Sequence, residues 1–378
     1  MKDKLAASCI FLGLGCFSGS VVAGDAPSFF VTNGMYPNIG MDWDSSFQYD
    51  YVHNNSGTDK TGTAAYVDIN PVVYLRFSPQ AQIWLDIELA PGSQVTAGEN
   101  EFFKNMGVTI NDLNYLYTAE KYWFRIGKYQ IPFGQASNVA PGLYTGDVVG
   151  DYDFDGYIGG VFAYRINAGE LGIFQPTVGT HFVDTTLLSK TYFQGGVRTK
   201  ESDGGPANTE SLESYSLVLD WSAIPSFYNL QMQAGYIFNA KGEGDEKSED
   251  AYTVSAQYFF TPSSNNLLGP QLSGHFFAIV PFVEYVKFDN KDGVAGAKET
   301  YLTTSLTANY GQWSLGLTRT EIDASGTGGG GPDDYLNELS VQYTFIDLIS
   351  LQVGVGNMRT DGDKAKVFGF NIDYARPF

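Results

Sequence analysis

The ten residues AQIWLDIELA, from Ala81 to Ala90, alternate between two kinds of side chain. A period of two predicts a β-strand, because successive side chains of a strand point to opposite faces. This strand has one apolar face and one mostly polar face. The first carries Ile83, Leu85, Ile87 and Leu89, and the second carries Gln82, Trp84, Asp86 and Glu88.

The same alternation recurs along the chain without a change of composition that would mark a domain boundary. One face is apolar each time, and the other face holds mostly Ser, Thr, Gln and Gly. We therefore expect a single all-β domain over residues 24–378. The clearest repeats are Tyr215 to Trp221, Leu230 to Phe238, Tyr252 to Phe260, Trp313 to Leu317, Leu339 to Phe345 and Leu351 to Val355.

Alternation alone does not distinguish a soluble sandwich from a transmembrane antiparallel β-barrel. The connections favour the barrel, because short turns at one end and long loops at the other are typical of outer-membrane proteins. Short turns are expected at Ser78 to Gln80, Ala119 to Lys121, Asn309 to Gln312 and Ile346 to Ser350. Longer polar loops are expected at Pro91 to Gly107, Asn239 to Asp250, Asp289 to Lys298 and Asp323 to Asp334.

The pattern yields about seventeen candidate strands, whereas a bacterial single-chain barrel needs an even number. Turns and loops alternate consistently from both ends except between Gln175 and Ser214. We expect about sixteen strands, with eighteen as the alternative. A barrel of that size is wide enough to hold an aqueous channel.

The composition agrees with a membrane barrel. Aromatic residues make up 15% of the chain, with 25 Tyr and 27 Phe, and there are 44 Gly. Aromatic residues suit strands and the girdles at membrane interfaces, and Gly suits tight turns. After the first residues no segment approaches the 18 consecutive apolar residues expected of a spanning helix.

The first 23 residues are typical of a secretory signal peptide. Lys2 and Lys4 precede an apolar run from Leu5 to Phe17, and small residues lead to Ala23. We expect cleavage before Gly24. Cleavage would remove both cysteines, Cys9 and Cys16. A lipoprotein signal at Cys16 is the weaker alternative, because Gly13 stands where Leu is usual.

The mature chain is strongly acidic. Without Lys2, Asp3 and Lys4, the chain keeps 20 basic and 41 acidic residues, a net charge of −21. Such a charge argues against nucleic acid as a partner, because phosphate binding needs basic residues. It also favours cations near the surface.

The last strand resembles the C-terminal signature that the barrel assembly machinery of outer membranes recognises. Alternate residues backwards from the terminal Phe378 are apolar except at Arg376, which can extend its charge to the interface. This resemblance implies residence in the outer membrane, with lipid and lipopolysaccharide as surroundings. The assembly residues would be Phe370, Ile372, Tyr374 and Phe378.

A second resemblance lies in Ile126-Gly127-Lys128-Tyr129-Gln130-Ile131-Pro132-Phe133-Gly134. This segment is similar to the passage from strand to loop in phosphate-selective and siderophore porins of Gram-negative bacteria, where Gly, a basic residue and Pro-Phe-Gly recur. It covers only these residues. The resemblance implies a sixteen-stranded porin, often a homotrimer, and does not carry over a substrate.

The segment from Gln135 to Gly156 has two interpretations. It is the fifth connection, and folded into the lumen it would line a constriction with acids that concentrate cations. As an extracellular loop, it would expose hydrated carboxylates or bind divalent ions that bridge lipopolysaccharide. The acids are Asp147, Asp151, Asp153 and Asp155.

Within this segment, Asp151, Asp153 and Asp155 stand at alternate positions before Gly156, like the opening of a calcium loop. The twelfth position is Phe162 and not Glu, which excludes an EF-hand. A weaker Ca²⁺ turn remains an alternative to solvated acids, and no other cofactor is expected.

Strand parity places further charges inside the barrel, where water tolerates them. Arginines facing carboxylates would create a transverse field that orients dipolar solutes. Salt bridges that brace the wall are the simpler alternative. The inward basic residues are Arg76, Arg125, Arg165 and Arg198. The inward acids on strands, which could neutralise them, are Asp86, Glu88, Asp220 and Glu338.

Catalysis finds no support in the sequence. The three histidines, His53, His181 and His275, are scattered, and none stands in a nucleophile elbow or a metal-binding pair. Too few residues precede the first strand to fill the lumen with a plug. The sequence predicts a porin for passive diffusion with a weak cation preference, and the alternative is a substrate-specific channel for siderophores or oligoanions.

Overall fold

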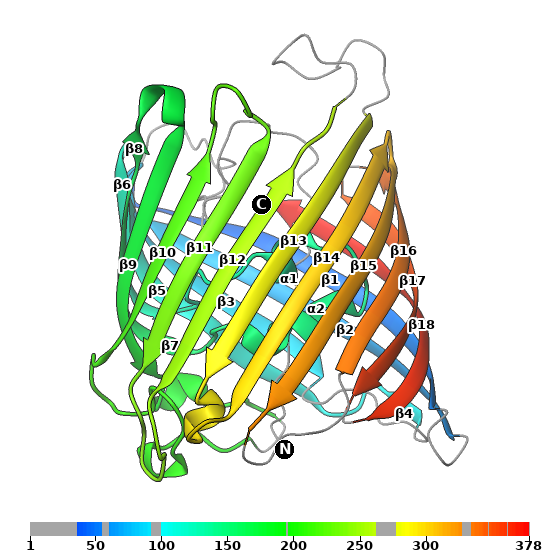
Figure 1. Cartoon of the computed structure of the whole chain (residues 1–378), viewed down its shortest axis with the longest axis horizontal. Helices are drawn as coiled ribbons and strands as arrows, with labels where there is room; N and C mark the ends of the chain where they lie inside the picture. Colours follow the sequence, from blue (N-terminus) through cyan, green and yellow to red (C-terminus); the bar gives the residue numbers. More distant parts are fainter. Residues whose placement is uncertain are drawn as a thin grey trace.

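In the computed structural model, sixteen antiparallel strands close into a barrel, as the sequence predicted (Figure 1). The structure describes residues 36–54, 60–91, 100–193, 196–261, 277–326, 334–346, 348–360 and 362–377. The expected signal peptide and Phe378 lie outside these ranges. No helix of the described part is long and apolar enough to cross a bilayer.

The wall strands follow one another around the barrel in chain order. They are β1 (Asn38–Asn54), β2 (Lys60–Arg76), β3 (Ala81–Pro91), β5 (Met106–Thr118), β6 (Tyr122–Tyr129), β7 (Tyr157–Tyr164), β9 (Ile173–Val183), β10 (Ser214–Ser222), β11 (Leu230–Asn239), β12 (Glu249–Tyr258), β13 (Phe277–Asp289), β14 (Lys298–Tyr310), β15 (Trp313–Ser325), β16 (Asp334–Ile346), β17 (Ile349–Thr360) and β18 (Asp363–Pro377).

The first and last wall strands pair with each other and close the barrel. β1 and β18 are in register from Asp42↔Pro377 to Asn54↔Ala365. Because the two terminal wall strands pair with each other, neither is left as an open sheet edge, which a membrane would not tolerate. Two short strands lie beside the wall: β4 (Asn100–Phe102) pairs parallel with β2, and β8 (Ile166–Asn167) pairs with β9.

The two ends of the barrel differ in their connections. At one end, here called the turn end, residues 77–80, 119–121 and 311–312 join strands. At the other, here called the loop end, the connections include residues 184–213, 240–248 and 290–297. The turn-end connections are not all short, because residues 165–172 and 223–229 also join wall strands at this end.

Side chains alternate between a polar inner face and an apolar outer face. On β14, Thr303 and Ser305 are buried, whereas Leu302 and Leu306 are exposed. An exposed apolar band around a closed sheet is the surface that acyl chains cover. The lumen therefore receives the polar side chains.

The connection 184–213 resolves the uncertain strand count. β9 ends at Val183, and no wall strand intervenes before β10. Asp184 accepts a hydrogen bond from Thr186 N at 2.8 Å, and the Thr186 hydroxyl accepts one from Leu188 N at 3.1 Å. Such local bonds compete with a strand ladder. The segment forms the 3-10 turns η3 (Leu187–Ser189) and η4 (Glu201–Asp203) instead.

The same connection seals a gap in the wall. β5 pairs with β3 up to Met106 but with β6 only from Leu113, which leaves part of its edge without β6. Val108 on this edge exchanges backbone hydrogen bonds of 3.0 and 2.8 Å with Tyr192. Residues 184–192, here called the wall seal, thus cover the gap.

A buried ion pair holds the wall seal to β6. Lys128 Nζ lies 3.1 Å from Asp184 Oδ2 and donates to the carbonyl oxygen of Leu188 at 2.8 Å. The two side chains are only 6% and 1% exposed. The basic residue of the porin-like segment therefore contributes to wall closure in this chain.

Candidate functional site

The chain leaves the wall after β6 and enters the lumen over residues 130–156, here called the inward segment. Gly127 of β6 lies just before the exit and has a φ of +132°. A Cβ at this glycine would lie 2.4 Å from the carbonyl oxygen of Leu113. Only glycine fits both the backbone angle and this close approach.

The inward segment contains three short helical turns: α1 (Ala136–Val139), α2 (Thr145–Val149) and η1 (Gly150–Tyr152). α1 and α2 lie inside the barrel (Figure 1). The sequence allowed two interpretations of residues 135–156. In the structure the segment lies in the lumen and is not an extracellular loop.

Glu284 of β13 anchors the first part of the inward segment. Its carboxylate accepts hydrogen bonds from Gln135 N at 2.5 Å and Ala136 N at 3.1 Å. It also accepts one from the Tyr152 hydroxyl at 2.7 Å. These bonds satisfy N–H groups at the start of α1 that have no partner within the helix.

Glu338 of β16 anchors the middle of the segment in the same way. It accepts hydrogen bonds from Leu143 N, from Tyr144 N at 3.1 Å and from the Thr145 hydroxyl at 3.0 Å. The Tyr144 hydroxyl in turn donates to Asp50 of β1 at 3.0 Å. The segment is therefore fixed to well-separated strands of the barrel.

Apolar contacts add to these anchors. Around the first anchor, buried side chains of the segment pack on the inner face of β11 to β14. Around the second, Leu143 and Tyr144 pack on Leu336 and Val367. The first group comprises Ile131, Phe133, Val149, Tyr152 and Phe154 against Ile237, Phe282, Val286, Phe288 and Tyr301.

The predicted constriction acids all lie on this segment, but not as one cluster. Asp151 and Asp155 are exposed, whereas Asp147 and Asp153 are half-buried. The Ser137 hydroxyl donates to Asp153 at 3.2 Å. In the described part of the chain no three acidic, His or Cys side chains are grouped to hold a metal ion. The Ca²⁺ turn at Asp151, Asp153 and Asp155 thus stays a prediction from spacing.

Another set of acids forms a continuous patch on the inner face, here called the acidic wall. It crosses five neighbouring strands from β18 to β5. Asp86 and Asp112 are direct register partners, and Asp68 and Glu88 are in hydrogen-bond contact. Its members are Asp44, Asp68, Asp86, Glu88, Asp112 and Asp373.

Neighbouring amides hold several of these carboxylates in place. Asn70 donates to Asp86 at 2.6 Å, Asn111 donates to Glu88 at 3.0 Å, and Asn371 donates to Asp373 at 2.7 Å. Amides orient the acids without neutralising their charge. Asp68 and Glu88 can hydrogen-bond to each other only while they share a proton, so the wall carries fewer negative charges than it has carboxyl groups and is still acidic.

The four arginines predicted to face the lumen do not form a continuous row opposite these acids. Arg76 is buried on β2, where it donates to Gln82 and lies over the Tyr74 ring. Arg125 lies 3.8 Å from Asp112. Arg165 follows β7 and lines a small pocket with Gln135 and Asp220.

The placement of Arg198 on a strand is wrong. This residue lies in the connection 184–213 with its side chain exposed. The parity argument fails there because the chain forms turns instead of a wall strand. Arg198 therefore does not line the barrel wall.

The two histidines within the described ranges differ in their surroundings. His181 is buried, with Nε2 2.9 Å from Asn239 Oδ1 and its ring against Tyr157. His53 lies on β1 near the loop end. His275 lies outside the described residues. Asn239 donates to Glu249 at 3.0 Å, so His181 belongs to a hydrogen-bond chain within the barrel.

No protein-family model and no characterised protein sequence matches the chain. Several solved structures, in contrast, are similar to the chain. The outer-membrane channel DcaP of Acinetobacter baumannii shares 13% identity, with a TM-score of 0.55 over 92% of this chain and 99% of that one. The high-pH structure of Pseudomonas putida OprB shares 12% identity, with a TM-score of 0.60 over 89% of this chain and 94% of that one.

A third similar structure is an anion-selective porin from Comamonas acidovorans, with 11% identity, a TM-score of 0.54 and coverage of 90% and 100%. At sequence identities this low, the similarity shows only that the fold is shared. The chain has the fold of sixteen-stranded porins of the Gram-negative outer membrane. In that fold the loop end faces the cell exterior and the turn end faces the periplasm.

Proposed function

We propose that this chain forms a water-filled channel of the outer membrane, through which small hydrophilic solutes and ions diffuse with a preference for cations. The acidic wall carries the proposal. Its six carboxyl groups face the lumen on five neighbouring strands. Of the inner-face arginines, Arg125 lies 3.8 Å from Asp112, and Arg76 is near Asp42, which is not part of the wall. A like-charged lining raises the local concentration of counter-ions.

The inward segment adds to this selectivity. Asp151 and Asp155 are exposed inside the barrel, so the segment and the wall carry the same sign of charge. Uptake of an oligoanion, the alternative from the sequence, would require the solute to pass both surfaces against repulsion. We therefore expect the opposite preference from the anion-selective porin of Comamonas acidovorans, whose fold is similar.

The reversal potential in a planar bilayer tests the preference. Under a KCl gradient the purified protein should favour K⁺ over Cl⁻. The variant D68N/D86N/D112N should lose most of this preference, because it removes three carboxylates from the wall. The variant E201Q/D203N/E210Q is the matched control, since it removes three acids from the connection 184–213.

Anion selectivity of the unaltered protein, or equal loss in both variants, would refute the cation channel. Folding of each variant is checked by heat-modifiable migration on a gel. A block of the current by added siderophore at micromolar concentration would favour the substrate-specific alternative.

Export and assembly are part of the proposal. Cleavage after Ala23 would deliver the chain to the periplasm. Phe370, Ile372 and Tyr374 then lie on the outer face of β18, where Phe370 stacks on Tyr49 of β1 with ring centroids 5.6 Å apart. We expect the assembly machinery to recognise these residues, and we expect a homotrimer, which unheated gel migration would test.

A further inference from the structure

The acidic wall ends at β18 and β1, where amide side chains adjoin its carboxyl groups. Register pairs Gln352 of β17 with Asn371 of β18, and Asp373 follows two residues later on the same inner face. Asp44 of β1 is diagonal to Asp373 and close enough for their charges to interact. The position between the two β18 residues, Ile372, is exposed on the outer face. We call Asp44, Gln352, Asn371 and Asp373 the acid–amide group.

Hydrogen bonds fix the carboxyl group of Asp373 from two sides. Asn371 Nδ2 donates to its Oδ1 at 2.7 Å, and the Ser350 hydroxyl donates to its Oδ2 at 3.2 Å. Gln342 Nε2 in turn donates to the Ser350 hydroxyl at 2.9 Å. These donors hold a carboxyl group in place and do not reach the amide oxygens of the acid–amide group.

The two amide oxygens of the group have no hydrogen-bond donor among the described residues. They are Gln352 Oε1 and Asn371 Oδ1, and the two residues are only 4% and 5% exposed. A buried acceptor without a donor costs free energy, so a solute with N–H groups is favoured here. Asp44 and Asp373 are half-buried, and their carboxyl groups remain accessible from the lumen.

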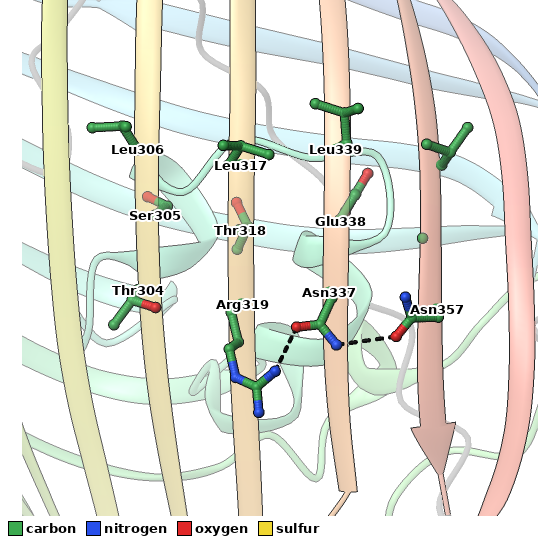
Figure 2. A pocket seen from close by; sticks show the side chains of 12 residues that line it. Thr304, Ser305, Leu306, Leu317, Thr318, Arg319, Asn337, Glu338, Leu339 and Asn357 are labelled. Carbon is green, nitrogen blue, oxygen red and sulfur yellow. Dashed lines mark hydrogen bonds between the residues drawn. The ribbon is translucent and has the colours of Figure 1, made fainter.

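Amides on the opposite face of the neighbouring wall have such donors. Figure 2 shows Asn337 of β16 and Asn357 of β17, which lie on the outer face. Arg319 Nη1 donates to Asn337 Oδ1 at 2.7 Å, and Asn337 Nδ2 donates to Asn357 Oδ1 at 3.0 Å. On β17 the amide oxygen without a donor, that of Gln352, therefore faces the lumen, where solutes pass.

The acid–amide group lies on the turn-end side of the inward segment. Gly354 and Gly369 are register partners one step toward the loop end. The inward segment approaches both, because a Cβ at Gly354 would lie 2.9 Å from Leu143 Cβ and a Cβ at Gly369 would clash with the Tyr144 hydroxyl. A solute that has passed the inward segment toward the periplasm therefore meets the acid–amide group next.

We propose that the acid–amide group binds the primary ammonium group of a small organic solute. This inference rests on the proposed cation channel and names a class of solute for it. A primary ammonium group has three N–H donors and no acceptor, so it matches carboxyl and amide oxygens. In the described ranges no three acidic, His or Cys side chains are grouped for a metal ion, so the oxygens favour hydrogen-bond donors.

Two isomeric cations test this proposal in planar bilayers. n-Butylammonium and tetramethylammonium have the same atomic composition and the same charge, but only n-butylammonium has N–H donors. It should block the K⁺ current of the unaltered protein at a concentration about tenfold lower than tetramethylammonium, because a hydrogen bond with a charged partner adds affinity of that order.

Two variants remove parts of the acid–amide group. Q352L removes one amide oxygen without a change of charge, and D44N/D373N replaces both carboxyl groups. In each variant the difference between the two cations should be largely lost. Heat-modifiable migration on a gel checks that each variant is folded.

Each variant has a matched control. Q257L removes an inner-face amide on β12 that is as buried as Gln352. D86N/D112N neutralises two other acids of the acidic wall. Both controls should keep the difference between the two cations, although D86N/D112N should lower the preference for K⁺.

Equal block by the two cations in the unaltered protein would overturn the binding of an ammonium group. An undiminished difference in both Q352L and D44N/D373N, or an equal loss in the controls, would do the same. The reversal potential in KCl without amine tests the proposed function separately. A cation-selective channel that fails the amine test would therefore refute this inference alone.

Discussion

Glu284 and Glu338 act as acceptors for the backbone of the inward segment, and the permeation path depends on them. At Glu284, the variant E284Q would place an amide donor against the N–H groups of Gln135 and Ala136. Loss of one such charge-assisted bond costs about 1.5–3 kcal/mol. We expect the segment to loosen and the single-channel current to fluctuate more.

The control is D289N, at the loop end of the same strand but on its outer face, where the carboxylate pairs with Lys287. Its current should match that of the unaltered protein. A steady current from E284Q, in folded protein, would show that the apolar contacts alone fix the segment.

Asp147 should make the selectivity pH-dependent. It belongs to the inward segment and not to a spanning strand. Burial and the nearby acids Asp50 and Glu338 raise the pKa of Asp147 to about 8. The carboxyl is thus mostly neutral at pH 6.5 and mostly charged at pH 9.

We therefore expect the preference for K⁺ to rise between pH 6.5 and pH 9, as the reversal potential would measure. The variant D147N should show a smaller rise than the unaltered protein and keep the selectivity of the acidic wall. An identical pH profile in both proteins would mean that another group titrates.

Among the elements, the wall seal depends on one buried ion pair. In the variant K128M, Asp184 keeps its place but loses its cation while it is only 1% exposed. An uncompensated buried charge costs about 3–5 kcal/mol. Urea unfolding of the protein in detergent should report a loss of that order.

The double variant K128M/D184N removes both charges and keeps the acceptor for Thr186 N. It should recover most of the lost free energy of unfolding. If the single and the double variant were equally unstable, the packing of the Lys128 chain would matter more than its charge.

The alternation of period two was sufficient to predict the wall, because each strand has the same pair of environments, lipid and lumen. β13 departs from this rule in an informative way. Both of its faces are apolar, with Phe282, Val286 and Phe288 on the inside. Such a strand indicates a covered inner face, and Glu284 in its middle marks where the covering segment is held.

The connections were harder to predict than the strands. In residues 184–213 the turns arise from side chains that bond their own backbone, and the sealing contact with Val108 is long-range. The grouping of the acidic wall could not be predicted from the sequence for a similar reason. Asp44, Asp68 and Asp373 have inward parity, but only the closure of β1 on β18 brings them together.

For the whole molecule, the cation preference should fall with ionic strength. Charges are screened beyond about 10 Å at 0.1 M salt and about 3 Å at 1 M. A preference that arises from the acidic wall acts across a water-filled lumen and should be several-fold larger at 0.1 M KCl than at 1 M. The variant D68N/D86N/D112N should show little dependence on salt.

The reversal potential at several KCl concentrations, with a constant ratio across the bilayer, measures this dependence. A preference that stays constant with salt would point to a narrow site that binds ions by contact. In that case the exposed acids of the inward segment, Asp151 and Asp155, would be the next residues to replace.

The wall seal has a consequence for a lone copy in the bilayer. Where the chain turns inward after β6, it would otherwise leave backbone groups of β5 facing lipid, and residues 184–192 come from the same polypeptide to cover them. One subunit is thus insulated without help from a neighbour. A newly inserted monomer should therefore have a sealed wall before it contacts other copies. Association with other copies can then take place after insertion and need not accompany it.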